Sequence, residues 1–358
     1  MFLSDYFVLY MSLAYVALLA PLLPTLLAPG NLVNVLSNMW PLLIVAIGQT
    51  FVLAVAGIDL SQGSVVALTS VLVAMLVATG ADPNVLSDAP VWGLVIDEGG
   101  GPLATVGGGI LIAIVLAAAV AAAIGLVNGL AVAVLAMPAF MVTLVSMISI
   151  SALAIYLTQS DNIARLPEAF VQLGKGDLVS VYFGAKDQSQ IPRRQIFSLV
   201  TYPMVIAVSV AVLSHVVLNR TVFGRQVLAV GINRRAAEVS GVPVRRVIVL
   251  AFVISSLCAA IGSVLYSARL EAGRPTLGDG NFLLDVIGAV VIGGTSLFGG
   301  KAKILWTFFG VLFFVLLSNT LNLMNLSSFQ VDMVKGAVIL LAALLDVLRT
   351  RLMRERTR

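Results

Sequence analysis

The sequence predicts an all-α polytopic membrane protein with about ten transmembrane helices and both termini in the cytoplasm. Three observations predict this class: 60% of the 358 residues are hydrophobic, only 11% are charged, and the mean hydropathy is +1.07. A soluble domain carries about a quarter charged residues, so this composition cannot supply a water-facing surface. One span uses about 20 residues, and the length therefore suits a single transmembrane domain over residues 1–358.

Ten apolar runs, separated by Gly, Pro or charge clusters, are the candidate spans. They are 5–28, 40–57, 61–80, 104–135, 139–158, 198–218, 247–268, 283–298, 304–322 and 332–348. The first is too long for a signal-peptide core and lacks a basic leader, so we expect a retained span. The fourth would reach roughly 45–50 Å as one straight helix against a core of about 30 Å, which predicts a tilt or break at Gly125 and Gly129. The eighth is short and Gly-rich, which leaves an incomplete crossing open.

Basic residues gather in one of two sets of segments between the spans. The first set holds thirteen of the 21 Lys and Arg residues and two acidic residues, and comprises 219–246, 299–303 and 349–358. The second set holds seven basic and ten acidic residues, and comprises 29–39, 81–103, 159–197, 269–282 and 323–331. The positive-inside rule places the first set in the cytoplasm, and alternation of ten spans then brings both termini to that side.

The expected external loops 81–103 and 159–197 are long, polar and rich in Gly, Pro and Asp. In the second loop, the alternation from Leu178 to Phe183 predicts a short strand. Two interpretations stay open for these loops. They form either a solvated cap without a specific function or a platform that receives a partner from outside.

The sequence GIDLSQGS at 57–64 interrupts the apolar pattern after the second run. A carboxylate inside the hydrocarbon costs about 2.5–3.5 kcal/mol, so Asp59 is not expected to face lipid. Glycines on both sides break the helix, and Ser61, Gln62 and Ser64 can satisfy the freed backbone groups. Asp59 is therefore either a helix N-cap at the cytoplasmic boundary or part of a break that lines a solute pathway.

Two further glycine patterns lie in apolar runs. The stretch GAVVIGGTSLFGG at 288–300 is a weaker echo of the first interruption, and paired interrupted helices in two halves indicate a midplane site. The stretch GLVNG at 125–129 allows two helices to approach closely. Asn128 within it either bonds a neighbouring helix or faces the solute.

The basic segment 223–243, FGRQVLAVGINRRAAEVSGVP, predicts a short helix outside the membrane. Asn233 is a good N-cap, Gly241 is a good C′ residue, and Pro243 prevents continuation. Two turns fit between them, with small residues on one face (Ala236, Ala237, Ser240) and charged residues for polar rims (Arg234, Arg235, Glu238). This helix is either a lever that enters a partner's cleft or a surface turn whose basic residues serve orientation.

From Asn31 to the C-terminal tail, the chain resembles the permease subunits of ribose-type (simple sugar) ATP-binding-cassette importers, which also group with branched-chain amino-acid permeases. Five motifs in one order carry the resemblance: GIDLSQGSVVAL at 57–68, GLVNGLAVAVLAMPAFMVTLVSM at 125–147, FGRQVLAVGINRRAAEVSGVPV at 223–244, DVIGAVVIGGTSLFGGKAKI at 285–304 and VKGAVILLAALLDV at 334–347. The insert at 84–101 looks longer than usual, which leaves open which binding protein docks there.

The resemblance implies partners: a second permease subunit, identical or paralogous, cytoplasmic ATP-binding subunits, and an external solute-binding protein. It matches Gly231, Asn233, Ala236, Ala237, Ser240 and Gly241 to the loop that engages the ATPase. With the charged neighbours Arg225, Arg234, Arg235 and Glu238, these form our expected ATPase-coupling residues in the cytoplasmic loop 219–246. It also matches Gly57, Asp59, Ser61, Gly63 and Ser64 to the first motif, and Pro138, Phe140 and Thr143 to the stretch after the fourth span.

A neutral, hydroxylated solute suits a pathway with few charges, because Ser, Thr, Asn and Gln can exchange hydrogen bonds with it. The expected solute-pathway residues are Asp59, Ser61, Ser64, Asn128, Phe140, Thr143, Ser146 and Asn319. Membrane lipid is the remaining expected contact. The basic pI of 9.4 comes mostly from the cytoplasmic loops and tail, and it fits orientation and anionic lipid better than nucleic acid.

Catalytic machinery is not expected in this chain. The stretch TSLFGGKA at 295–302 lacks the first Gly and the final Ser or Thr of a phosphate-binding loop. One His and one Cys cannot form a common zinc site. We therefore expect no catalytic residue, no metal and no cofactor, with ATP hydrolysed by a separate subunit.

The sequence thus predicts the multi-pass subunit of an ATP-driven importer of a small sugar-like solute in the inner (cytoplasmic) membrane. Other solutes stay open for the same machinery: a nucleoside, an autoinducer-type molecule or a branched-chain amino acid. A secondary transporter driven by an ion gradient requires intramembrane proton or sodium ligands, and Asp59 is one clear candidate. A membrane-bound transferase requires a catalytic constellation that the sequence does not contain.

Overall fold

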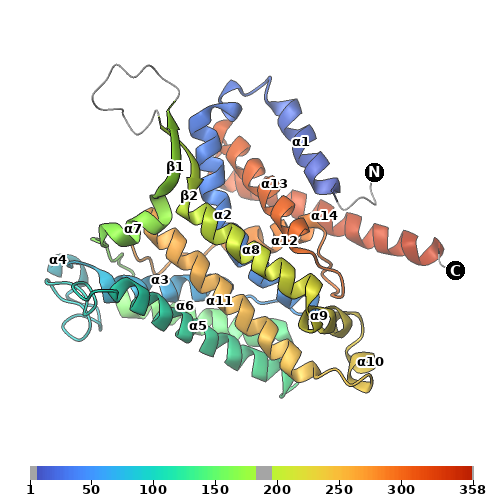
Figure 1. Cartoon of the computed structure of the whole chain (residues 1–358), viewed down its shortest axis with the longest axis horizontal. Coiled ribbons are helices and arrows are strands. Elements are labelled where there is room, and N and C mark those ends of the chain that lie inside the picture. Colours follow the sequence, from blue (N-terminus) through green and yellow to red (C-terminus); the bar gives the residue numbers. More distant parts are fainter. Residues whose placement is uncertain (1–5, 183–195, 357–358) are drawn as a thin grey trace.

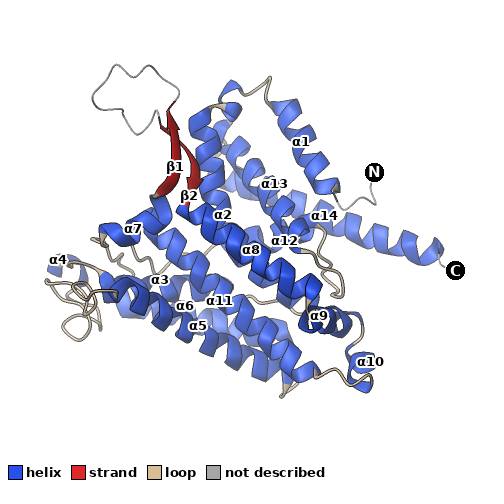
Figure 2. Ribbon diagram, viewed as in Figure 1, coloured by secondary structure: helices blue, strands red, loops and turns tan. Residues whose placement is uncertain are grey.

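The computed structural model of the chain describes residues 6–182 and 196–356. These residues are mainly helical, with a two-stranded antiparallel hairpin of β1 (Asp177–Tyr182) and β2 (Ile196–Thr201) (Figures 1 and 2). The helices are α1 (Phe7–Leu19), η1 (Pro24–Leu27), α2 (Pro29–Ala54), α3 (Gln62–Val77), α4 (Pro83–Leu86), α5 (Gly109–Ala133), α6 (Ala139–Thr158), α7 (Glu168–Lys175), α8 (Tyr202–Arg220), α9 (Val222–Ile232), α10 (Arg234–Val239), α11 (Val244–Leu270), α12 (Phe282–Gly293), α13 (Ile304–Leu323) and α14 (Ser328–Arg356).

Within the described residues, six helices are long and apolar enough to cross a membrane: α2, α5, α6, α8, α11 and α13. The helices α2, α11 and α13 are mostly buried, and α11 packs against α5, α2 and α3. In contrast, α5, α6 and α8 expose large apolar side chains such as Leu111, Val145 and Leu213. Such an apolar exterior suits lipid or a second subunit. The polytopic class is confirmed, whereas the count of ten spans stays a prediction.

Most apolar runs became helices close to their expected bounds, and the run 139–158 coincides with α6. The N-terminal region differs. The run 5–28 is divided into α1 and the short η1, and α2 begins at Pro29 instead of residue 40, so the expected loop 29–39 is wrong. Three asparagines of this stretch have hydrogen-bond partners on other helices: Asn31 bonds to Asn319, and both Asn34 and Asn38 accept from Arg269.

Of the tilt or break predicted at Gly125 and Gly129, the break is wrong, because α5 is continuous through both residues, and the tilt stays a prediction. The run is shortened instead by turns over residues 102–108. Gly125 and Gly129 allow α5 to approach α11 closely, as the GLVNG pattern indicated. A Cβ on Gly125 would lie 2.7 Å from the Phe252 carbonyl oxygen. The short run 283–298 yields α12, whose 12 residues reach about 18 Å.

The short helices and the hairpin that connect the long helices lie at two ends of the molecule. In Figure 1, α9, α10 and the end of α14 lie to the right, whereas α4, α7 and the hairpin lie to the left. The strand predicted over 178–183 is confirmed as β1, and Phe183 lies outside the described residues. This separation agrees with the two charge sets, and the cytoplasmic location of the termini stays a prediction.

Candidate functional site

Asp59 lies in the break segment, residues 55–61, which joins α2 to α3, and its side chain is fully buried. Its Oδ1 accepts hydrogen bonds from the Ser61 amide at 2.9 Å and the Ser61 hydroxyl at 2.6 Å. Its Oδ2 accepts from the Ser255 hydroxyl of α11 at 2.7 Å. The N-cap residue of α3 is Ser61, so Asp59 does not occupy that position. It ties the break to α11 instead.

Further hydrogen bonds extend from Asp59 in two directions. On one side, Asn128 Nδ2 of α5 donates to Ser61 Oγ at 3.0 Å, and Ser146 Oγ of α6 donates to Asn128 Oδ1. On the other side, Gln62 Nε2 donates to Ser255 Oγ at 2.8 Å. We call this set the polar chain: Ser146, Asn128, Ser61, Asp59, Ser255 and Gln62. Every donor points toward the carboxylate, and such a consistently oriented buried network holds its helices in one arrangement.

The remaining expected pathway residues divide into three groups. Ser64 and Thr143 bind the break segment through Ser61 O at 2.8 Å and Ile58 O at 3.2 Å, respectively. Phe140, on the first turn of α6, is 54% exposed. Asn319 lies apart from the polar chain and exchanges two hydrogen bonds with Asn31, of 2.9 and 2.8 Å, which join α13 to α2.

The two glycine-rich interruptions meet in space. The glycine loop, residues 294–303 between α12 and α13, donates the Gly300 amide to the Ala54 carbonyl at 3.0 Å. A Cβ on Gly299 would lie 2.7 Å from Cβ of Ala56, which itself has φ +60°. Only glycine fits this approach without displacing the neighbouring backbone. The second glycine-rich stretch, 288–300, therefore packs directly against the end of α2 and the start of the break segment.

The coupling segment, residues 219–246, contains α9 and α10. Asn233 Oδ1 accepts from the Ala236 amide at 3.0 Å, and Gly241 has φ +82°, so both predicted caps are confirmed. On the two-turn helix α10, Ala237 is buried and Val239 is 86% exposed. The exposed valine was not among the expected coupling residues. Its signal was one apolar residue between Glu238 and Ser240, which a single short helix does not distinguish from chance.

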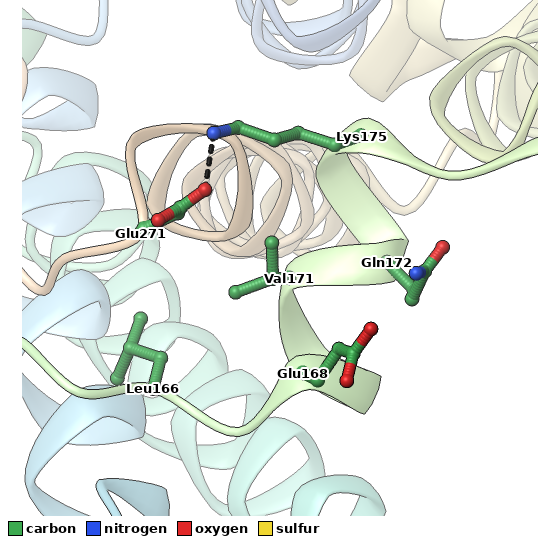
Figure 3. Close-up of a pocket in the computed structure, with 6 residues that line it drawn as sticks. All are labelled: Leu166, Glu168, Val171, Gln172, Lys175 and Glu271. Carbon is green, nitrogen blue, oxygen red and sulfur yellow. Dashed lines mark hydrogen bonds and ion pairs between the residues drawn. The ribbon is translucent and has the colours of Figure 1, made fainter. Parts of the chain in front are cut away.

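A surface pocket of about 440 Å³ lies between α7 and the end of α11 (Figure 3). It is lined by Leu166, Glu168, Val171, Gln172, Lys175 and Glu271. Lys175 and Glu271 point toward one another and form an ion pair, although both side chains are about half exposed. The pocket belongs to the end of the molecule that carries the hairpin and the acidic loops.

Comparison with known proteins gives the family. Residues 31–343 match the family described as branched-chain amino acid transport system, permease component. The chain belongs to this permease family. It is 34% identical to the ribose import permease protein RbsC of Bacillus subtilis (strain 168) over 323 residues, which cover 90% of this chain and 86% of the relative. No solved structure gives a significant match.

Other relatives of the permease cover the chain equally well. It is 33% identical to RbsC of Escherichia coli (strain K12) over 93% of this chain and 91% of the relative. It is 30% identical to the L-arabinose ABC transporter permease protein AraH of Azospirillum brasilense over 93% of this chain and 84% of the relative. The match therefore extends over nearly the whole membrane domain.

The permease also contains a partly buried ion pair that the sequence reasoning missed. Lys335 Nζ of α14 lies 2.8 Å from Asp285 Oδ2 of α12, and the side chains are 13% and 22% exposed. The Lys335 ammonium group also lies 5.5 Å from the ring centroid of Phe314. In the sequence, Asp285 and Lys335 each lie near the start of an apolar run and of one of the five motifs that carry the resemblance. Their pairing was not visible because 50 residues separate them.

We expect Lys335→Met to destabilise the permease by about 3 kcal/mol, because Asp285 is left without its counter-ion in a mostly buried position. Glu271→Gln, which breaks the exposed pair with Lys175, should cost at most about 1 kcal/mol. Thermal unfolding of the purified permease in one detergent measures both. The double variant Lys335→Met with Asp285→Asn should recover part of the loss, and equal effects for the two single variants would contradict the assignment.

Proposed function

We propose that this chain is the membrane-spanning subunit of an ATP-binding-cassette importer that carries a small sugar or sugar-like solute across the cytoplasmic membrane. The observation that carries the proposal is the 30–34% identity, over nine-tenths of the chain, to permeases named for ribose and L-arabinose. The polar chain inside an apolar helix bundle supports a route for an uncharged, hydroxylated solute, and the buried Gln62 Oε1 accepts no hydrogen bond within the described residues.

ATP would be hydrolysed by a separate cytoplasmic subunit that receives α10. Three features support this role: the helix has a cap at each end, it lies at the end opposite the hairpin, and it exposes Val239 beside charged side chains. Exposed apolar side chains with a polar rim are typical of a protein contact. We assign this contact to Arg225, Asn233, Arg234, Arg235, Ala236, Glu238, Ser240 and Gly241, whereas the buried Gly231 and Ala237 would hold the segment against the helix bundle.

The pathway residues would act in two ways. We assign direct solute contact to Phe140 and Ser146, whose side chains are at least partly exposed. The buried residues would set the position of the break segment beside the solute: Asp59, Ser61, Ser64, Asn128 and Thr143. Asn319 would contribute at the external end, where it meets Asn31 at the start of α2.

The other partners follow from the two remaining surfaces. An external solute-binding protein would dock on the loops 81–103 and 159–197, where the pocket beside Lys175 lies. A second permease subunit and membrane lipid would cover the apolar exterior of α5, α6 and α8. The ten predicted spans correspond in this proposal to α1, α2, α3, α5, α6, α8, α11, α12, α13 and α14, with α9 in the cytoplasm.

The test is uptake by vesicles that contain the permease together with its ATP-binding subunit and its solute-binding protein. We expect MgATP to drive uptake of labelled D-ribose, L-arabinose or D-allose about tenfold or more above vesicles without the ATP-binding subunit, since that subunit supplies the driving force. Accumulation that survives removal of the subunit and follows an imposed ion gradient would contradict the proposal. Transport of leucine in place of all three sugars would contradict the sugar assignment.

A further inference from the structure

Three backbone segments meet where the coupling segment joins the helix bundle. Gly231, in the last turn of α9, is buried, and a Cβ at this position would lie 1.9 Å from the Ala54 carbonyl oxygen and 2.4 Å from the Gly300 amide nitrogen. Gly300 in turn donates its amide to the same Ala54 carbonyl. The end of α9 therefore touches the end of α2 backbone to backbone, with no side chain between them.

Arg234, the residue after the N-cap of α10, makes a second connection between the coupling segment and the helix bundle. Arg234 Nη2 donates to the Ala133 carbonyl at 3.3 Å, and Ala133 is the last residue of α5. The helix α10 is thus connected to the ends of two helices. One is α2, which leads directly into the break segment with Asp59. The other is α5, which carries Asn128 a little more than one turn before Ala133.

These two helices hold the two sides of one hydrogen bond in the polar chain. Asn128 of α5 donates to Ser61 of the break segment at 3.0 Å, and both partners are neutral. The Asp59 carboxyl group is held by three shorter bonds, of 2.9 and 2.6 Å from Ser61 and 2.7 Å from Ser255. The Asn128–Ser61 bond is consequently the weaker connection, and a relative movement of α2 and α5 would break it first.

We propose that Gly231 and Arg234 are positioning residues that convert a displacement of α10 into separation of Asn128 from Ser61 during the transport cycle. This inference rests on the proposed function, because the displacement comes from the ATP-binding subunit. The direct contact at Gly231 leaves no flexible side chain to absorb movement, and close-packed interiors transmit strain. Opening of the polar chain would then free the hydroxyl and amide groups that a passing solute needs.

The first test compares Gly231→Ala with Gly310→Ala in vesicles containing the assembled transporter. Gly310 of α13 is the matched control, because its Cβ would lie 2.0 Å from the Ala289 carbonyl oxygen, away from α9 and α10. We expect Gly231→Ala to lower sugar transported per ATP hydrolysed about tenfold, and Gly310→Ala to change this ratio less than about twofold, although both reduce stability. Equal ratios in the two variants would overturn the proposal.

Exposed Arg234 provides variants that do not depend on a buried glycine. Arg234→Met removes the donor to Ala133 and should lower transport per ATP about threefold, whereas Arg234→Lys keeps a donor and should recover most of it. Unchanged transport per ATP in Arg234→Met would show that the bond to Ala133 is not needed for coupling, and it would overturn the role of the bond to α5.

Cys258 offers a readout that needs no solute. It is 5% exposed and lies beside the polar chain, since a Cβ on Gly48 would be 2.9 Å from Cys258 Cβ and 3.0 Å from Gln62 Nε2. We expect MgATP to accelerate modification of Cys258 by a small methanethiosulfonate reagent about fivefold in the wild type and less than twofold in Gly231→Ala. The same acceleration in both would overturn the proposal. If the proposed function is wrong, the wild type itself shows neither ATP-driven uptake nor ATP-driven modification.

Discussion

Gly241→Arg is expected to reduce ATP-driven uptake about thirtyfold, which corresponds to about 2 kcal/mol for a buried charge without a partner at the contact with the ATP-binding subunit. Gly241 has φ +82°, and a Cβ there meets no atom within 4 Å. The substitution therefore adds modest backbone strain without a clash inside the permease. The loss should arise at the partner's surface, where the new cation would lie.

Gly280→Arg is the matched control for this prediction. Gly280 has φ +65°, its surroundings are equally open, and it lies in the loop between α11 and α12, away from the coupling segment. It should change uptake less than about twofold, as surface substitutions away from special features do. Both variants are measured with the amount of inserted permease determined in the same vesicles. Parallel losses in both would refute the assignment of α10, whereas deletion of residues 236–239 should reproduce the effect of Gly241→Arg.

Local signals explain what could be predicted of the coupling segment and the spans. The caps of α10 involve partners within four residues, such as Asn233 and Ala236, so the sequence shows both members of each interaction. The same holds for the apolar runs that became α6 and α13, because composition alone decides whether a segment can enter the membrane.

Interactions between distant residues explain what was missed. The start of α2 is polar, and its partners Arg269 and Asn319 lie more than 200 residues away in the chain. Ser255 is part of the polar chain, but a serine in an apolar run carries no sign of the carboxylate that it will meet. For the same reason, Asn319 was grouped with Asp59 by residue type, although the structure places it between α13 and α2.

Asp59→Asn is the second variant with a large expected effect. The carboxylate accepts three hydrogen bonds while fully buried, and an amide can replace only one of its two acceptor oxygens. The new amide group would face a hydroxyl that now donates, and a buried group left unsatisfied costs about 1–3 kcal/mol. We expect uptake to fall about tenfold and the thermal unfolding midpoint to decrease, because the break segment loses its tie to α11.

Asp279→Asn is the control, since this exposed carboxylate accepts a single bond of 3.1 Å from Ser151. Its stability should change by less than about 0.5 kcal/mol. A double-mutant cycle between Asp59→Asn and Ser255→Ala then measures the tie itself. Because Ser255 donates directly to Asp59, the cycle should give a coupling energy of about 1–2 kcal/mol, whereas the Asp279 and Ser151 cycle should give values near zero.

The outcome for Asp59→Asn also separates a purely structural role of this carboxyl group from a role in transport. A residue that only satisfies the backbone where a helix resumes would lower stability and leave transport per folded molecule unchanged. A residue that holds the break beside a solute route should lower transport per folded molecule as well, because Asn128 and Ser61 lose the carboxylate on which their orientation depends. Normal stability with normal uptake would contradict both, since it would mean that three buried hydrogen bonds to one carboxylate contribute nothing.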